Sequence, residues 1–165
     1  MSRDNVTPFR RPPRRPPPKP SGKLGLTTHR GKAVFVHILT LACFATPFVL
    51  GGQLGQMVGL ALGVAAGFIA YSSRYDSMPW AMTHHEHALR TLIIAFVVRT
   101  IVSLPSLLIS RDPPQGFMIQ VLEVYGLISF WVGLIVLIWV VIRAGVGLVL
   151  AILRKPIWHP RGWLL

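Results

Sequence analysis

The stretch from Trp80 to Thr91 (WAMTHHEHALRT) is the one place where imidazole, carboxylate and guanidinium side chains occur together in this 165-residue chain. On a helix, His84 and His87 stand three residues apart and share a face, whereas His85 points elsewhere. Such a group could bind a metal ion, respond to pH because imidazole titrates near neutrality, or hold an anionic ligand. These alternatives stay open at this point.

A zinc-protease site is excluded by the spacing of the histidines. The motif His-Glu-x-x-His places two imidazoles four residues apart, with the glutamate as the base. Here His85 and Glu86 are followed by leucine at position 89, where the motif requires its second imidazole. Another metal site would need His37 or His159 to approach the cluster, and nothing in the pattern requires this. We therefore predict no metal and no other cofactor.

The start of the histidine stretch matches a helix-capping pattern. Thr83 followed by Glu86 three residues later is a capping box, which predicts a helix that begins near His84. Its first turns would lie at the membrane surface, with the histidines solvated or facing lipid. The stretch is then a candidate docking or headgroup-binding site on the cytoplasmic side. Its candidate residues are Trp80, His84, His87, Arg90 and Thr91.

Two more charged residues fall inside apolar runs. An arginine within a membrane span costs about 2.5–3.5 kcal/mol on insertion scales, so Arg99 must face protein, face water or extend to the surface. Glu123 is the only acidic residue in any predicted span, and counting inward from the outer turn brings it within about one helical turn of Arg99. We predict an ion pair between them that locks the third span to the fourth.

Four apolar stretches must position these side chains. Each is long enough, at about 1.5 Å per residue, to cross a hydrocarbon layer of about 30 Å. We divide the last stretch at Arg143, because the apolar run is too long for one span, and expect an interfacial C-terminal segment after it. The predicted spans are about 33–50, 54–71, 88–109 and 117–142.

The second span contains a glycine at every fourth residue. This GxxxG spacing forms a stripe that lets two helix backbones approach closely, and close approach is how membrane helices associate. The pattern does not tell whether the partner is a helix of the same chain or a second copy. The helix-packing residues are Gly55, Gly59, Gly63 and Gly67.

The first 32 residues differ in composition from the rest. They contain nine of the 17 lysines and arginines and many prolines, which predicts a disordered basic tail at 1–32 ahead of a membrane domain at 33–165. Over the whole chain, 52% of residues are hydrophobic and only 13% are charged, well below the roughly 25% of soluble domains. The single cysteine, Cys43, lies in an apolar run and is expected to be a small buried hydrophobe.

The distribution of lysine and arginine predicts the orientation. One side would hold the tail with nine basic residues, the 72–90 loop with two and the C-terminal region with four, whereas the other side holds Arg111 alone. The positive-inside rule then places both termini and the histidine loop in the cytoplasm.

The chain resembles a family of small, uncharacterised four-span inner-membrane proteins of proteobacteria, a domain-of-unknown-function group distantly similar to the Tic-twenty component of the chloroplast envelope translocon. The first matching motif is a tryptophan and a histidine before an arginine-threonine pair, formed by Trp80, His84, Arg90 and Thr91. The second follows the last span and consists of Arg143, Gly147, Leu148, Pro156, Pro160, Trp163 and Leu164. The resemblance covers about 33–165. It implies four spans and no established activity.

We therefore expect an all-α membrane protein of the bacterial inner membrane that is not an enzyme. The chain contains no phosphate-binding glycine loop and no Ser-His-Asp or Cys-His set around a plausible pocket. The favoured function is an accessory or scaffold subunit that acts by helix–helix association. The alternative is a small transporter or translocation-channel component that uses Arg99 and Glu123. Expected partners are anionic lipid headgroups and further copies or a larger complex. Nucleic acid is not expected.

Overall fold

The structure, a computed structural model, describes residues 28–109, 116–159 and 162. These residues form four helices and no strand: α1 (His29–Leu50), α2 (Gly52–Ser73), α3 (Pro79–Ile109) and α4 (Phe117–Ile152). Each helix is long and apolar enough to cross a membrane, with mean hydropathies between 1.7 and 2.7. The prediction of an all-α fold with four membrane helices is confirmed. The predictions for the tail up to residue 27, and for Pro160 and Trp163, fall outside the described residues.

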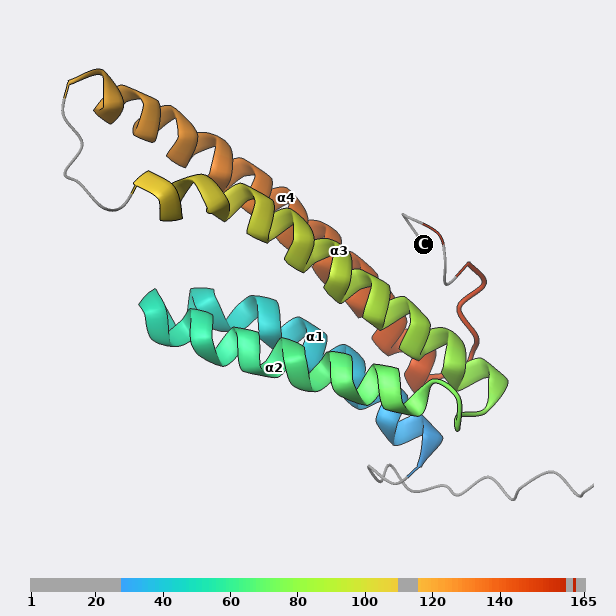
Figure 1. The fold of residues 1–165 in the computed structure, drawn as a ribbon. Coiled ribbons are helices and arrows are strands. Elements are labelled where there is room, and N and C mark those ends of the chain that lie inside the picture. Colours follow the sequence, from blue (N-terminus) through green and yellow to red (C-terminus); the bar gives the residue numbers. More distant parts are fainter. Residues whose placement is uncertain (1–27, 110–115, 160–161, 163–165) are drawn as a thin grey trace, which may run out of the picture.

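The helices form two antiparallel hairpins, α1–α2 and α3–α4 (Figure 1). The hairpins lie close together at the end that holds the start of α1, the α2–α3 connection and the end of α4; we call this the converging end. They separate toward the opposite end, where α1 turns into α2 at Gly51; we call this the diverging end. The two hairpins thus converge at one end of the molecule and diverge at the other.

Helix α3 begins earlier than the sequence predicts. It starts at Pro79 rather than near His84, so Thr83 lies inside the helix and is not its cap. Proline suits the first turn of a helix because its missing N–H needs no partner there. The Thr83 hydroxyl donates to the Trp80 carbonyl oxygen at 2.7 Å and accepts from the backbone N–H of Ile157 at 3.1 Å. The extra turn brings the histidines into the bundle.

Helix α4 also differs from the prediction, because it runs without a break through Arg143 to Ile152. It ends in a turn in which Arg154 adopts a left-handed conformation (φ 56°) and the Lys155 N–H bonds to the Leu150 carbonyl oxygen. This turn reverses the chain, so that the segment after α4 packs on the first turns of α3 through the buried Ile157.

Glycines allow α1 and α2 to pack closely. A Cβ at Gly59 would lie 2.7 Å from the Cys43 carbonyl oxygen, and a Cβ at Gly55 would lie 3.0 Å from the Pro47 backbone, so larger residues would force the helices apart. Gly63 meets the Phe96 ring of α3, whereas Gly67 has nothing within 4 Å. Three of the four glycines in the stripe therefore approach other helices of the same chain.

Candidate functional site

The histidines at the start of α3 are buried. The exposed fractions of His84, His85 and His87 are 0%, 0% and 1%, and His37 of α1 is 0% exposed. The expectation of solvated or lipid-facing histidines is wrong, because α3 begins a turn earlier and the C-terminal segment covers it. His37 lies eight residues after the start of α1, about 12 Å along that helix. The imidazoles therefore lie inside the bundle at the converging end.

Hydrogen bonds through His84 join α1, α3 and the C-terminal segment. His84 Nε2 lies 2.9 Å from the carbonyl oxygen of Lys155, and its Nδ1 lies 3.2 Å from His37 Nε2. A carbonyl oxygen only accepts, so His84 Nε2 must carry a proton. In the neutral pair His84 Nδ1 then carries no proton, so His37 Nε2 donates to it. If His37 Nδ1 takes up a further proton, the shared proton can move to His84 Nδ1, and the pair can then pass a proton from α1 to α3.

Arg143 anchors α4 to α3 in the same region. Its Nε donates to the Thr91 hydroxyl at 2.9 Å, and Thr91 in turn donates to the His87 carbonyl oxygen at 2.8 Å. The His87 ring nitrogen Nε2 lies 3.4 Å from the Arg143 carbonyl oxygen. The guanidinium carbon lies 5.2 Å from the centre of the Trp139 ring, within cation–π range. We call His37, His84, His87, Thr91 and Arg143 the histidine–arginine cluster.

Several polar atoms of this region have no hydrogen-bond partner among the described residues. They are both terminal nitrogens of Arg143, the Nδ1 atoms of His37 and His87, and both ring nitrogens of His85. Arg143 is only 1% exposed, and the one ion pair recorded in the described part of the chain joins Arg90 to Glu86 at 3.3 Å. Each unpartnered buried polar group costs about 1–3 kcal/mol, and more when charged. Such groups inside a membrane bundle usually mark a functional site.

The cluster does not form a metal site in the described structure. No three histidine, cysteine, aspartate or glutamate side chains within the described ranges are placed to hold one ion. His37 and His84 approach each other closely enough to share a hydrogen bond instead. The chemistry that the cluster offers is therefore proton transfer and the binding of negative charge.

Gly147 of α4 makes room for His37. A Cβ at Gly147 would overlap the imidazole ring of His37, so only glycine allows α4 to pack against it. Gly145, two residues earlier on the same helix, has nothing within 4 Å. The family resemblance pointed to Gly147 as part of a motif, and its contact gives that position a physical reason.

An apolar layer separates the cluster from the diverging end. It is formed mainly by Leu39, Phe44, Leu92, Phe96 and Val140, with the Phe44 and Phe96 rings 5.7 Å apart. Along α3, the layer takes up the five residues that follow Thr91 and end at Phe96, about 7.5 Å. It is therefore a thin barrier between the buried polar groups and the space beyond.

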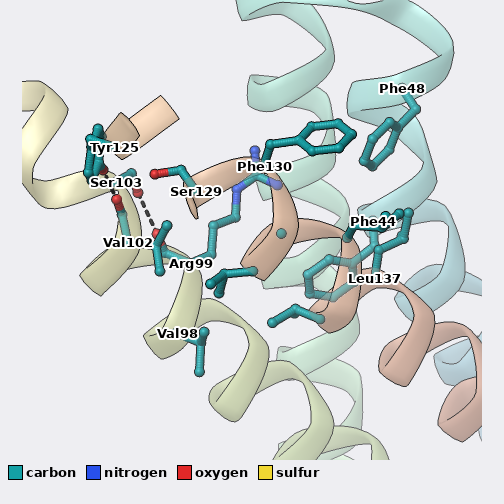
Figure 2. A pocket seen from close by; sticks show the side chains of 14 residues that line it. Phe44, Phe48, Val98, Arg99, Val102, Ser103, Tyr125, Ser129, Phe130 and Leu137 are labelled. Carbon is teal, nitrogen blue, oxygen red and sulfur yellow. Dashed lines mark hydrogen bonds between the residues drawn. The ribbon is translucent and has the colours of Figure 1, made fainter. Parts of the chain in front are cut away.

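Two cavities lie on the other side of this layer, between the hairpins. One of about 370 Å³ lies between α1, α3 and α4, and one of about 350 Å³ lies between α1, α2 and α3. Arg99 lines both and is the only charged residue that lines either within the described ranges. Figure 2 shows its side chain extending from α3 across the first cavity toward Phe130 of α4. A third cavity of about 210 Å³, at the converging end, is lined by His87 and His159.

The structure does not bring Arg99 and Glu123 together: both are exposed, and no ion pair between them occurs in the described part of the chain. The Tyr125 hydroxyl donates to the Val102 carbonyl oxygen, which sets the register of α3 against α4. In this register Ser129 and Phe130 lie beside Arg99, while Glu123 lies nearer the end of the hairpin. The predicted pair rested on counting residues inward from the turn between α3 and α4. That count gives depth but does not tell which faces of the two helices meet.

Only part of the predicted docking site is accessible. Trp80 and Arg90 are partly exposed, and Arg90 pairs with Glu86, whereas His84, His87 and Thr91 are buried. From the sequence, His37 was a candidate only as a further metal ligand or as part of the polar path of a transporter, and Arg143 only as part of a motif after the last span. A signal for both existed, because each is a polar residue within an apolar run.

The chain matches no model of a known protein family, no curated protein and no solved structure in three separate comparisons.

Proposed function

We propose that the protein is a small transport component of the membrane, in which a solute enters between the hairpins at the diverging end and passes the apolar layer next to the histidine–arginine cluster. The observation that carries this proposal is the buried cluster itself. It holds an arginine whose two terminal nitrogens have no partner among the described residues, and cavities lie between the hairpins beyond the apolar layer. An ionisable side chain desolvated inside a membrane bundle is by default a candidate for function.

The cluster would act as the inner closure. His37–His84 joins α1 to α3, Arg143–Thr91 joins α4 to α3, and His84–Lys155 attaches the C-terminal segment. Of these bonds, only His37–His84 joins one hairpin to the other, so breaking it would remove this link between the hairpins at the converging end. Hydrophobic constrictions next to polar groups are a common means of gating small membrane proteins. Proton movement between His37 and His84 offers a way to control this step.

The glycine stripe does not provide the contact surface that the scaffold function favoured by the sequence would use. Gly55, Gly59 and Gly63 face α1 and α3, so they are occupied within the chain. Only Gly67 has open space beside it. Association with other copies is still part of the proposal, because the cavities open sideways between the hairpins. Any such contact must use other surfaces.

The proposal places the protein in a bacterial inner membrane, and the charge distribution supports an orientation with the converging end in the cytoplasm. Apart from Arg99, the described basic residues outside the cluster gather at that end, and the turn at the diverging end between α1 and α2 has none. This arrangement follows the positive-inside rule and suits anionic headgroups. The residues are Arg30, Lys32, Arg74, Arg90, Arg154 and Lys155.

Flux in proteoliposomes tests the function. We would measure the entry of hexanesulfonate, which is permanently anionic, of hexyltrimethylammonium, which is permanently cationic, and of protons through a trapped pH dye. At least one should enter faster than into protein-free liposomes, and the excess should disappear in Arg143→Leu. Arg90→Leu, which also removes one positive charge near this end, should retain it.

Two results would overturn the proposal. One is the absence of excess flux for all three probes with correctly folded protein. The other is a flux that Arg143→Leu leaves unchanged, since the cluster would then not take part. Copurification of a stable partner by wild type and Arg143→Leu alike, with no flux, would favour the scaffold function instead.

A further inference from the structure

We infer that the cavity between α1, α3 and α4 binds an apolar molecule that carries a single anionic, oxygen-bearing head group, with Arg99 as the residue that binds the head. This deepens the proposed function by naming its substrate class, and only the transport of that ligand rests on the proposed function. The inference comes from the charge, the lining and the size of the cavity.

The charge of the lining selects an anion. Among the described residues that line the cavity, Arg99 is the only charged one and none is a carboxylate that could neutralise it. Arg99 lies ten residues before the end of α3, about 15 Å along the helix, and Figure 2 shows it directed into the cavity. A guanidinium binds carboxylate, sulfonate or phosphate oxygens through two parallel hydrogen bonds. The cavity therefore complements one negative charge at this depth.

The rest of the lining selects an apolar body. Phe44, Phe48 and Phe130 contribute aromatic rings, and valines and leucines of α3 and α4 cover most of the remainder. Besides Arg99, three polar side chains of the described residues line it. Ser129 has a buried hydroxyl oxygen with no partner among the described residues, the Ser103 hydroxyl donates to the Arg99 carbonyl oxygen, and the Tyr125 hydroxyl donates to Val102. A site of this kind, apolar with a few polar groups that fix orientation, is typical of small-molecule pockets.

The size of the cavity fits a small organic molecule. Its volume of about 370 Å³ falls within the range of about 300–1,000 Å³ that small-molecule pockets occupy. Gly133 lines the cavity and has nothing within 4 Å, so a larger side chain there would fill the space without a clash. Gly126, seven residues earlier on α4, also has open space but does not line the cavity. These two glycines give a matched pair of variants.

Equilibrium binding to the full chain tests the inference without requiring transport. The protein would be placed in nanodiscs of zwitterionic lipid and titrated calorimetrically with hexanesulfonate, hexanol and hexyltrimethylammonium, with empty nanodiscs as the blank for partitioning. We expect hexanesulfonate to bind at least tenfold more tightly than the other two, because a charge-assisted hydrogen-bonded pair contributes more than that. Arg99→Gln should remove the preference for the anion, and Arg99→Lys should retain part of it.

Gly133→Leu should weaken hexanesulfonate binding about tenfold or more, and Gly126→Leu should not change it. The inference fails if the three probes bind equally, if Arg99→Gln leaves the preference intact, or if both glycine variants behave alike. Anion-selective binding without flux would keep the site and reject the proposed transport function. Flux with no preference for the anion would keep transport and reject this site.

Discussion

The two ends of the bundle give an arginine side chain opposite surroundings. At the converging end, Arg143 is 1% exposed, its Nε is bound to Thr91, and the Trp139 ring lies against it. At the diverging end, Arg99 extends into a cavity with mostly apolar walls. The residue type is the same, and the separation between the hairpins makes the difference. Where the hairpins meet, the charge joins helices; where they part, it faces the space that a ligand would fill.

This difference has an energetic meaning. The converging end combines a desolvated charge and several unpartnered nitrogens with hydrogen bonds across three segments. Such an arrangement is weak support for stability, because desolvation offsets much of what the bonds contribute. Its stability must come from the tight packing around it. Packing and polarity at this end can therefore be tested separately.

The largest effect on stability is expected at the contact between Gly147 and His37. Gly147→Ala places a Cβ within the imidazole ring, which must move and lose its bond to His84. Overpacking together with the buried unpartnered nitrogens should lower the free energy of unfolding by about 3 kcal/mol. Unfolding by sodium dodecyl sulfate in mixed micelles measures this. Gly145→Ala, on the same helix with open space, should change it by less than about 0.5 kcal/mol. Equal effects would show that the His37 contact does not matter.

The contact between Gly147 and His37 also shows what the sequence could and could not predict. The four apolar runs predict four helices because length and hydropathy are local properties, and α1, α2 and the start of α4 fall within a few residues of the expected bounds. The contact of His37 with residues more than 40 positions later depends on which helix faces meet, and no local pattern reports this. For the same reason the predicted Arg99–Glu123 pair had no basis beyond depth.

The predicted start of α3 was wrong for a different reason. Thr83 and Glu86 match a capping box, but Pro79 also suits a helix start and lies about one turn earlier. The Thr83 hydroxyl then accepts a hydrogen bond from the backbone N–H of Ile157 in the C-terminal segment. That shift turned a solvated histidine stretch into a buried one. A tertiary contact from the far end of the chain decided between two local signals.

The second prediction separates polarity from packing. Arg143→Leu removes a buried charge that has no counter-ion among the described residues and leaves Thr91 bonded to the His87 carbonyl oxygen. Replacing buried charged groups with apolar ones is often stabilising, so we expect the free energy of unfolding to rise by about 2 kcal/mol while transport is lost. The same micelle titration measures the change.

Arg90→Leu serves as the control for this change. Arg90 is partly exposed and pairs with Glu86, so its replacement should alter stability by about 0.5 kcal/mol or less. A marked loss of stability in Arg143→Leu would mean that Arg143 serves mainly to hold α4 to α3. The contrast between the two ends would then lose its functional meaning.

The third prediction concerns the packing of α2 against α1, in the hairpin that runs from the converging end to the diverging end. Gly59→Ala should lower stability by about 1–2 kcal/mol, because its Cβ would lie 2.7 Å from the backbone oxygen of Cys43 and the two helices would have to separate. Gly67→Ala meets open space and should be neutral or slightly stabilising, since alanine is the better helix former. Thermal unfolding in mild detergent can compare the two. If Gly67→Ala proves the more harmful variant, the stripe contacts a second copy rather than α1.

The smallest effect is expected at the turn that closes the converging end. Arg154 has a φ of 56°, a conformation that costs non-glycine residues about 1–2 kcal/mol, and the turn directs the Lys155 carbonyl oxygen to His84. Arg154→Gly should relieve this strain, whereas Arg154→Ala should keep it. Both variants lose the same side chain, so the difference between them isolates the backbone. The Arg154→Gly variant should have the higher free energy of unfolding, by up to about 1 kcal/mol. The gain is limited to this because glycine also has greater freedom in the unfolded chain. If alanine is equal or better, the C-terminal segment is not held by this turn, and the closure at the converging end depends on the helices alone.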